Sequence, residues 1–362
     1  RLERSITGLL QSQDVRLIRG TGRLVGPHEV VADTEDGPVE IEADAVLLST
    51  GSRPRIPDCA PVVGDRVLTT RDAYPPPTMP EHLVVIGSGV TGVEFVHMFS
   101  SFGCDVTLIV SRQQVLPRKD PEVAAALEEN FIERGVKLLM GARAEGIDVT
   151  DDGITVRCDD GRRPTGSHAL LAIGSIPNSD KLGLETAGVV TDGGYVTVDR
   201  HCRSNIPHIY AAGDLSGKLP LSSVASMQGR KIAEHVMGLQ ARAHKHLDYD
   251  KAASAIFTEP EIADVGLAEA DAFAEGRKIR VTKVPFSSNA KALILDDPRG
   301  FVKILSDPAT GVVLGGSIVG RNAAELISVI ALAVTAGLRV SDIHESLLVH
   351  PALAEALAEA AE

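Results

Sequence analysis

The sequence is short of positive charge and of long apolar runs, and each shortage excludes a class of protein. Lys and Arg together number 36 against 49 Asp and Glu, which gives a formal net charge of -13. An acidic surface repels phosphate groups, so we expect neither a nucleic acid nor an anionic membrane as partner. The longest apolar run, at 326–338, is shorter than the roughly 20 residues of a transmembrane helix. It predicts a buried helix and no membrane insertion.

Cysteine is also scarce, and its spacing carries no metal signature. The four cysteines, Cys59, Cys104, Cys158 and Cys202, are scattered, and no Cys-x-x-Cys pair occurs. Isolated thiols of this kind are typical of reduced proteins. We therefore expect a cytoplasmic protein without a metal site.

The sequence does contain an internal repeat. ADAVLLSTGSRP at 43–54 resembles SHALLAIGSIPN at 167–178, and both are apolar strands that end in Gly-Ser-x-Pro, at Gly51 and Gly174. Each follows a polar alternating stretch with an acidic turn (TEDGPVEIEAD and TDDGITVRCDDGRR), a pattern that predicts a β-hairpin. Two copies of one nucleotide-binding architecture are the natural interpretation.

The two copies differ in what precedes them. A glycine loop beginning at Gly87 lies upstream of Gly174, whereas only 50 residues precede Gly51 and they contain no such loop. A comparable loop for the first copy would lie before Arg1. We expect that this chain lacks an N-terminal part of its parent; the alternative is a protein with half of its first fold.

The glycine loop GSGVTG follows the apolar strand HLVVI and opens a helix. Gly87 permits a tight turn, Gly89 lets the backbone approach a pyrophosphate, and Gly92 permits close packing of helix on strand. Val90 and Thr91 begin the helix, whose free N–H groups favour a phosphate. The context predicts a dinucleotide site; the alternative is a glycine-rich turn without a ligand.

The end of the next strand, IVSRQQ, bears on which dinucleotide is bound. Val110 stands where an acid usually binds the ribose hydroxyls of NAD, about 20 residues past the loop. Ser111 and Arg112 follow, and a hydroxyl with a guanidinium can bind a 2′-phosphate. NADPH is therefore expected to be accepted; alternatively, Arg112 points into solvent.

A third region begins near 248. Four stretches read as strands (KAASAIFTEPEIADVGL, KIRVTKVPF, FVKILSD and VLGGSIVG), and two read as helices (NAAELISVIALAVTAG and PALAEALAEAAE). Strands grouped before helices predict an α+β module rather than a further βαβ repeat. The proline-rich YPPPTMPEH at 74–82 is a plausible domain connector.

Together these motifs resemble the flavin-dependent pyridine nucleotide-disulfide oxidoreductases over nearly the whole chain. The segments that carry the resemblance are LLSTGSRPRIP, GSGVTGVEF, AIGSIPNSDKLGLETAGV, IYAAGDLSGKLPLSSVASMQGR and the terminal HPALAE. Within the family, they look most like the NAD(P)H quinone reductases of actinobacteria. The resemblance implies an α/β fold with two Rossmann-like domains, one for FAD and one for NAD(P), and a C-terminal α+β dimerisation domain. The implied boundaries are 1–73 (FAD, first part), 74–180 (NAD(P)), 181–247 (FAD, second part) and 248–362 (dimerisation).

The resemblance also assigns residues to FAD. Asp214 would bind the ribityl or pyrophosphate region, although an isolated Asp there would usually be a helix cap. Glu94 would pair with a lysine near flavin N5, and that lysine is expected upstream of Arg1; a surface Glu near a helix start is the alternative. The remaining implied cofactor contacts are Thr50, Gly51, Gly174, Gly213, Pro220, Leu221, Ser222 and Ser223.

The terminal motif VHPALAE carries the last pair of implied residues. In disulfide-reducing relatives the His at position 350 is a general base, oriented by the Glu at 355, and faces the partner subunit's flavin. Here His350 and Glu355 are present, while Ala352 and Ala354 replace the usual Thr and Ser. The family's Cys-x4-Cys pair does not occur in this sequence. His350 is therefore either an active base or an inherited scaffold.

The expected activity follows from the resemblance. A homodimer binding FAD and NADP(H) or NAD(H) would pass a hydride from NAD(P)H to the flavin and electrons on to a quinone. A dihydrolipoamide dehydrogenase-type disulfide oxidoreductase is the first alternative. A non-catalytic nucleotide-binding subunit is the second.

Overall fold

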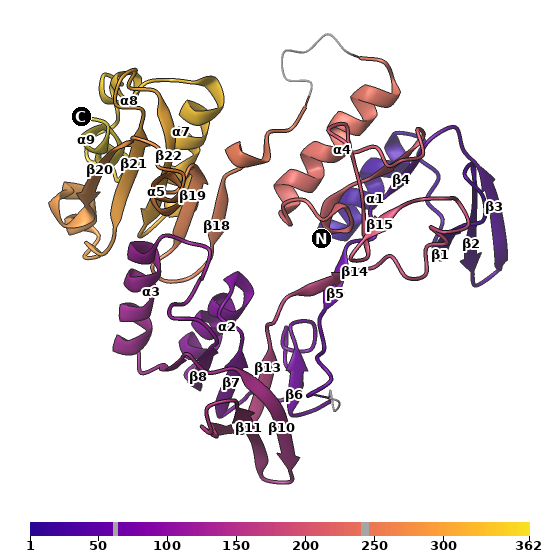
Figure 1. The fold of residues 1–362 in the computed structure, drawn as a ribbon, viewed down its shortest axis with the longest axis horizontal. Coiled ribbons are helices and arrows are strands. Elements are labelled where there is room, and N and C mark those ends of the chain that lie inside the picture. Colours follow the sequence, from indigo (N-terminus) through magenta and orange to yellow (C-terminus); the bar gives the residue numbers. More distant parts are fainter. Residues whose placement is uncertain (61–63, 240–245) are drawn as a thin grey trace. The chain divides into compact units, whose positions relative to one another are not determined.

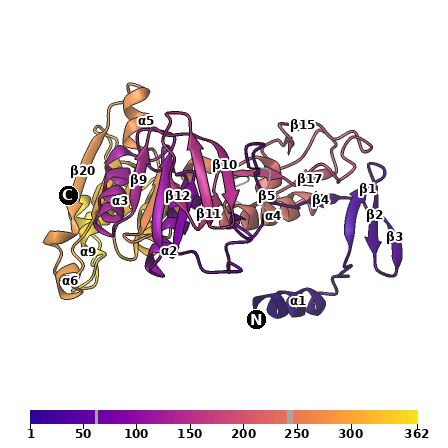
Figure 2. The same ribbon diagram turned by 90° about the horizontal axis from the view of Figure 1, so that it is seen from below.

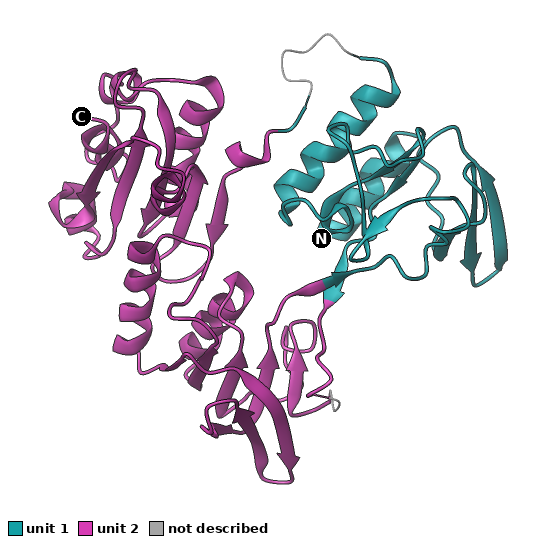
Figure 3. Cartoon of the chain, in the orientation of Figure 1, with its two compact units in different colours: residues 1–53, 176–247 teal, residues 54–175, 248–362 magenta. Residues whose placement is uncertain are grey.

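The computed structural model describes residues 1–60, 64–239 and 246–362. The chain forms two compact units, coloured separately in Figure 3. Unit 1 contains residues 1–53 and 176–247, and unit 2 contains residues 54–175 and 248–362. The chain therefore passes from one unit to the other three times, at 53/54, 175/176 and 247/248.

Unit 1 is built on a small parallel strand pair and an antiparallel sheet. The hairpin predicted from TEDGPVEIEAD is present, because β2 pairs with β3 in antiparallel register from Glu29↔Glu42 to Thr34↔Gly37. Helix α1 (Leu2–Ser12) has no buried residue, and in Figure 2 it lies apart from β1, β2 and β3. The other elements are β1 (Thr21–Leu24), β2 (Glu29–Thr34), β3 (Gly37–Glu42), β4 (Val46–Leu48), β15 (Thr191–Asp192), β16 (Tyr195–Val196), β17 (Ile209–Ala211), the 3-10 turn η1 (Gly213–Ser216) and α4 (Ser222–Val236).

The first half of unit 2 is a five-stranded parallel sheet in the order β6-β13-β7-β8-β9. The strands predicted around the glycine loop are confirmed, as β7 (His82–Ile86) and β8 (Asp105–Val110) with α2 (Val90–Ser101) between them. β6 (Val67–Thr69), which precedes the predicted connector at 74–82, is an edge strand of the same sheet. The remaining elements are α3 (Pro121–Glu133), β9 (Lys137–Met140), β10 (Ala144–Thr150), β11 (Gly153–Cys158), β12 (Thr165–Gly166) and β13 (His168–Leu171).

Both faces of this sheet are buried, which explains its continuous apolar strands. Leu83 and Val85 of β7 join the cluster that includes Phe99 of α2 and Phe131 of α3. Val84 and Ile86 of β7 face the opposite side of the sheet and pack with Ile154 and Val156 of β11. Alternate residues of one strand thus hold helices on one side and the β10–β12 hairpin sheet on the other.

The second half of unit 2 is a five-stranded antiparallel sheet in the order β18-β19-β22-β21-β20, which confirms the α+β prediction. The predicted buried helix is α7 (Ala323–Ala336), with Ile327 and Ile330 in the core. The second predicted helix was too long, because α9 (Glu355–Ala360) begins only at Glu355. The other elements are η2 (Tyr249–Lys251), β18 (Ser254–Ile256), β19 (Ile262–Gly266), α5 (Glu269–Ala274), β20 (Arg280–Pro285), η3 (Phe286–Ser288), α6 (Ala290–Ile294), β21 (Phe301–Ser306), β22 (Val313–Val319) and α8 (Val340–His344), shown in Figure 1.

An ion cluster around a buried lysine lies at the start of α3. Lys303 of β21 is 1% exposed, and its Nζ lies 3.1 Å from Oδ2 of Asp120, whose side chain is 3% exposed. Nζ also donates to Oε2 of Glu122 at 3.2 Å and to Oε2 of Glu269 at 2.8 Å. Asp120 Oδ1 accepts a hydrogen bond from the backbone N–H of Ala270 at 3.2 Å. One buried ammonium thus binds carboxylates from two separate elements of unit 2.

The repeated Gly-Ser-x-Pro segments lie at the first two crossings between the units. Gly51 and Gly174 both adopt the left-handed backbone that favours glycine, with φ +69° and +95°. The strands that follow them, β5 (Ser52–Pro54) and β14 (Ser175–Pro177), pair with one another. The backbone N–H of Arg55 donates to the carbonyl of Gly174 at 2.9 Å. The repeat seen in the sequence is therefore a matched pair of turns that are distant along the chain and adjacent in space, because β5 and β14 pair.

Candidate functional site

The glycine loop between β7 and α2 shows a separate physical need for each glycine. A Cβ on Gly87, where φ is +109°, would lie 2.4 Å from the carbonyl oxygen of Ala172. A Cβ on Gly92 would lie 1.9 Å from the carbonyl oxygen of Gly87. No atom of the described residues lies within 4 Å of a Cβ built on Gly89. Gly87 and Gly92 thus serve packing, while Gly89 leaves open backbone at the start of a helix. Open backbone at this point fits the approach of a pyrophosphate.

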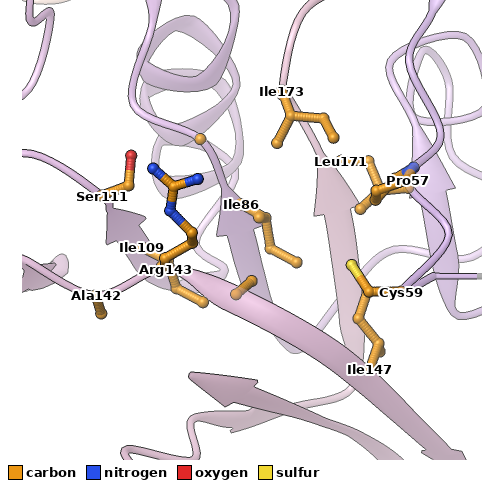
Figure 4. A pocket seen from close by; sticks show the side chains of 12 residues that line it. Pro57, Cys59, Ile86, Ile109, Ser111, Ala142, Arg143, Ile147, Leu171 and Ile173 are labelled. Atoms are coloured by element: carbon orange, nitrogen blue, oxygen red, sulfur yellow. The ribbon is translucent and has the colours of Figure 1, made fainter. Parts of the chain in front are cut away.

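A pocket of about 270 Å³ adjoins this loop. Its walls come from the carboxyl ends of β7, β8 and β13 and from the beginning of β10, the edge where ligands bind in parallel sheets. Figure 4 shows Ser111 and Arg143 on one side of the pocket, with Pro57 and Cys59 on the opposite side. The lining residues are Pro57, Cys59, Ile86, Gly87, Ile109, Ser111, Ala142, Arg143, Ala144, Ile147, Leu171 and Ile173.

The residues predicted to select the nucleotide lie at the end of β8. Position 110 holds a valine, which is fully buried, and therefore carries no carboxylate. Ser111 lines the pocket. Arg112 is exposed and is not among the described pocket residues; its carbonyl accepts a hydrogen bond from the N–H of Gly141 at 3.2 Å. Sequence reasoning missed Arg143, which lines the pocket although it lies 32 residues beyond Ser111 along the chain.

In unit 1, Asp214 lies in the turn η1 after β17. Its Oδ2 accepts a hydrogen bond from the hydroxyl of Ser52 at 2.5 Å. Gly213 has φ +66°, and its N–H donates to Oε1 of the fully buried Gln228 at 2.7 Å. Gln228, also missed from the sequence, therefore fixes the backbone that presents Asp214.

Of two further predicted flavin segments, the one at Thr50 and Gly51 is held by hydrogen bonds with Asn178. The Thr50 hydroxyl donates to the carbonyl of Asn178 at 2.9 Å, and Asn178 Nδ2 donates to the carbonyl of Thr50 at 2.9 Å. Gly51 follows, and its carbonyl accepts from the N–H of Asn178 at 3.0 Å. α4 begins at Ser222 without a side-chain cap, so its first N–H groups are left for water or a ligand. The segment around this start, Pro220, Leu221, Ser222 and Ser223, is exposed or half-buried.

Glu94 lies in α2 and is tied to the second half of unit 2. Its Oε1 accepts a hydrogen bond from the backbone N–H of Phe257 at 3.0 Å. Burial raises the pKa of Glu94, and the hydrogen bond from Phe257 offsets part of that rise. Both residues line a groove of about 540 Å³ together with Tyr74, Phe95, His97, Met98, Ser101 and Phe102.

His350 and Glu355 are brought together before α9. His350 Nδ1 lies 2.8 Å from Oε1 of Glu355, and Oε2 of Glu355 accepts from the N–H of Ala352 at 2.8 Å. The Ala352 N–H, followed by His350, holds the pKa of Glu355 below its usual value. The imidazole is 74% exposed and is therefore open to a reacting group. The alanine that replaces the family threonine supplies its backbone to orient the carboxylate.

Within the described residues, no group of three or more His, Cys, Asp or Glu side chains could hold a metal ion. The four cysteines are free thiols. No helix in the described part of the chain has the length and apolar character that a membrane crossing requires.

The fold and these motifs define the class of protein. Residues 1–229 match the family model described as pyridine nucleotide-disulphide oxidoreductase, and residues 252–361 match the dimerisation domain of that family. The chain is 43% identical to a protein of Mycobacterium tuberculosis named NAD(P)H dehydrogenase (quinone), over 98% of this chain and 73% of the relative. It is 33% identical to the dihydrolipoyl dehydrogenase of Bacillus subtilis, over 100% of this chain and 77% of the relative.

Solved structures agree with these relatives. The crystal structure of LpdA from Mycobacterium tuberculosis superposes with a TM-score of 0.93 at 43% identity, covering 99% of this chain and 79% of that one. The Cu(II) complex of the HOCl-induced flavoprotein disulfide reductase RclA of Escherichia coli gives 0.87 at 26% identity, covering 95% and 78%. The chain belongs to the pyridine nucleotide-disulphide oxidoreductases, which confirms the predicted family and fold class. This family implies FAD and a nicotinamide dinucleotide as cofactors.

Proposed function

We propose that this chain is an FAD-dependent NAD(P)H oxidoreductase that reduces a quinone. The supporting observation is the glycine loop, where open backbone at Gly89 meets a helix start beside a pocket whose described lining holds no carboxylate. The quinone follows from the name of the 43% identical relative. When bound, the flavin would supply the electron chemistry, accepting two electrons from the nicotinamide and releasing them to the acceptor.

The residues of this chain would bind and orient the two cofactors. Gly89, Val90 and Thr91 would hold the dinucleotide pyrophosphate through backbone N–H groups at the helix start, while Gly87 and Gly92 would allow the close packing that places this loop. Glu94, fixed by Phe257, would place its carboxyl near the reacting ring. The FAD contacts would come from the segments around Thr50 and Gly51, Gly174, Gly213 and Asp214, and from 220–223.

For the nucleotide, we propose that NADPH is accepted alongside NADH. Position 110 carries no acid that would repel a 2′-phosphate, and Ser111 lines the pocket. The sequence places a guanidinium next to it, at Arg112. The matching dimerisation domain further supports a homodimer, and the four free thiols support a cytoplasmic location. We retain the domain boundaries 1–73, 74–180, 181–247 and 248–362 as part of the proposal.

A dihydrolipoamide dehydrogenase-type activity is the second candidate, because the His350–Glu355 pair is assembled. The two candidates separate in one experiment on the full-length protein. We would measure NADPH oxidation with menadione, and NAD reduction with dihydrolipoamide, for the parent and for His350→Ala. A quinone reductase is expected to keep menadione turnover within about twofold in His350→Ala and to show no dihydrolipoamide turnover.

The disulfide oxidoreductase candidate predicts the opposite result. Dihydrolipoamide turnover that His350→Ala abolishes would overturn the quinone proposal in favour of a thiol–disulfide mechanism, because only the latter needs a base for a thiol proton. Glu355→Gln serves as the matched variant, since Gln can still accept from the Ala352 N–H while the charge is lost.

A further inference from the structure

The pocket beside the glycine loop has apolar walls and, among the described residues that line it, a single charged side chain. Ile86, Ile109, Ile173 and their neighbours form the walls, and no carboxylate is among these described residues. The charged side chain is Arg143. Flat apolar walls suit an aromatic base, and one cation at the rim suits an anionic group carried by that base's sugar.

The backbone of Arg143 is fixed, although its side chain is exposed. Its N–H donates to Oδ1 of Asp159 at 2.9 Å, and its carbonyl accepts from the N–H of Asp159 at 3.0 Å. The preceding Ala142 is buried and donates to the carbonyl of Val110 at 3.1 Å. These hydrogen bonds fix the backbone of Arg143 at the rim of the pocket, beside the end of β8.

Its guanidinium, by contrast, has no hydrogen-bond or ion-pair partner among the residues that the structure describes. Two nearby arginines are already engaged, since Arg157 pairs with Asp148 and Arg162 with Asp160. In Figure 4 the Arg143 guanidinium and the Ser111 hydroxyl lie on the same side of the pocket. A guanidinium and a hydroxyl placed together match a phosphate dianion.

We infer that Arg143, with Ser111, binds the 2′-phosphate of NADPH, while the apolar walls of the pocket receive the adenine. This inference rests on the proposed function and refines it. The sequence predicts that Ser111 and Arg112 bind the 2′-phosphate; Ser111 lines the pocket, whereas Arg112 is exposed and is not among the described lining residues. Arg143 is thus the main specificity-determining residue for the nucleotide, and Arg112 contributes less.

The test is calorimetric binding of 2′,5′-ADP and 5′-AMP to the purified full-length protein, which needs no turnover. Arg143→Gln is expected to weaken 2′,5′-ADP binding at least tenfold and to change 5′-AMP binding by less than about twofold, because only the former carries the 2′-phosphate. The matched control Arg112→Gln is expected to weaken 2′,5′-ADP by less than about threefold.

Two results would overturn the inference while leaving the proposed function in place: a larger loss in Arg112→Gln than in Arg143→Gln, or an equal loss of both ligands in Arg143→Gln. A parent protein that binds neither ligand would overturn the inference and the proposed nucleotide site together.

Cys59 provides an independent readout of where the ligand binds. It lines the pocket and is half-buried, whereas Cys104, Cys158 and Cys202 are buried. Saturating 2′,5′-ADP is expected to slow iodoacetamide labelling of Cys59, followed by mass spectrometry, by at least fivefold. An unchanged labelling rate at saturation would place the adenosine elsewhere and contradict the assignment.

Discussion

Replacement of the buried Lys303 by methionine is expected to destabilise unit 2 strongly. Methionine keeps the length of the side chain but leaves the Asp120 carboxylate, 3% exposed, without the ammonium 3.1 Å away. Breaking a buried pair by removing one partner costs about 3–5 kcal/mol. For a domain of this size the loss corresponds to a fall of roughly 6–20 °C in the unfolding temperature. Circular dichroism during thermal unfolding measures it directly.

Two control variants show whether the buried charge is the cause. Lys283→Met removes an ammonium that lies 3.1 Å from Glu122 but is 42% exposed, so its cost should stay below about 1 kcal/mol. The double variant Lys303→Met/Asp120→Asn should recover much of the loss, because no uncompensated charge remains buried and Asn can still accept from Ala270. Equal costs for the two single lysine variants, or no recovery in the double variant, would refute the reasoning.

The same cluster sets an acid limit on stability. Burial pushes the pKa of Glu122 up, but hydrogen bonds from Lys283 and Lys303 outweigh it and hold the pKa below its ordinary value of 4.5. A depressed carboxylate pKa contributes stability above the ordinary value, and that contribution disappears as pH falls through the folded-state pKa. The unfolding temperature should therefore drop below about pH 4.5, and less steeply in Lys303→Met. If the unfolding temperature fell equally steeply with pH in the parent and in Lys303→Met, the bond from Lys303 would not be the origin of the acid limit.

The remaining predictions concern the glycine loop and Glu94. Gly89→Ala should keep the parent unfolding temperature within about 2 °C, since no described atom lies within 4 Å of the new Cβ, yet weaken 2′,5′-ADP binding at least tenfold. Gly92→Ala should lose both stability and binding because its Cβ would lie 1.9 Å from the Gly87 oxygen; normal binding by Gly89→Ala would argue against a phosphate at this loop. Glu94→Gln should unfold at a higher temperature than the parent at pH 7, because burial raises the pKa of Glu94 and the stability that its neutral form gives at low pH is lost as pH rises through that pKa. That gain should vanish at pH 4, and a gain independent of pH would show that charge is not its origin.

The sequence predicted the local elements of the site well, because each depends on a short pattern. An apolar strand followed by three spaced glycines predicted β7, the loop and α2 together. Strands grouped before helices predicted the C-terminal α+β module. The repeated Gly-Ser-x-Pro motif marked the first two of the three crossings between the units.

What the sequence could not predict depends on contacts between distant segments. Lys303 sits in FVKILSD, where a lysine usually points to solvent, and only the approach of α3 and α5 explains its burial. Arg143 reaches the nucleotide pocket because β9 returns the chain to the end of β8. The bond between Glu94 and the backbone of Phe257 likewise joins residues 163 positions apart. No periodic pattern encodes such pairs, since each depends on how whole elements dock.

The paired strands β5 and β14 have a consequence for how this architecture diversifies. They bring the first and last residues of the 54–175 segment side by side, with Arg55 bonded to Gly174. A segment whose two ends lie side by side can be replaced by another segment without a change in the position of the chain on either side of it. Recombination at these two matched turns would therefore transfer a coenzyme preference in a single event, as long as the incoming segment keeps Asp120 and Glu94, which bind Lys303 and Phe257 outside it.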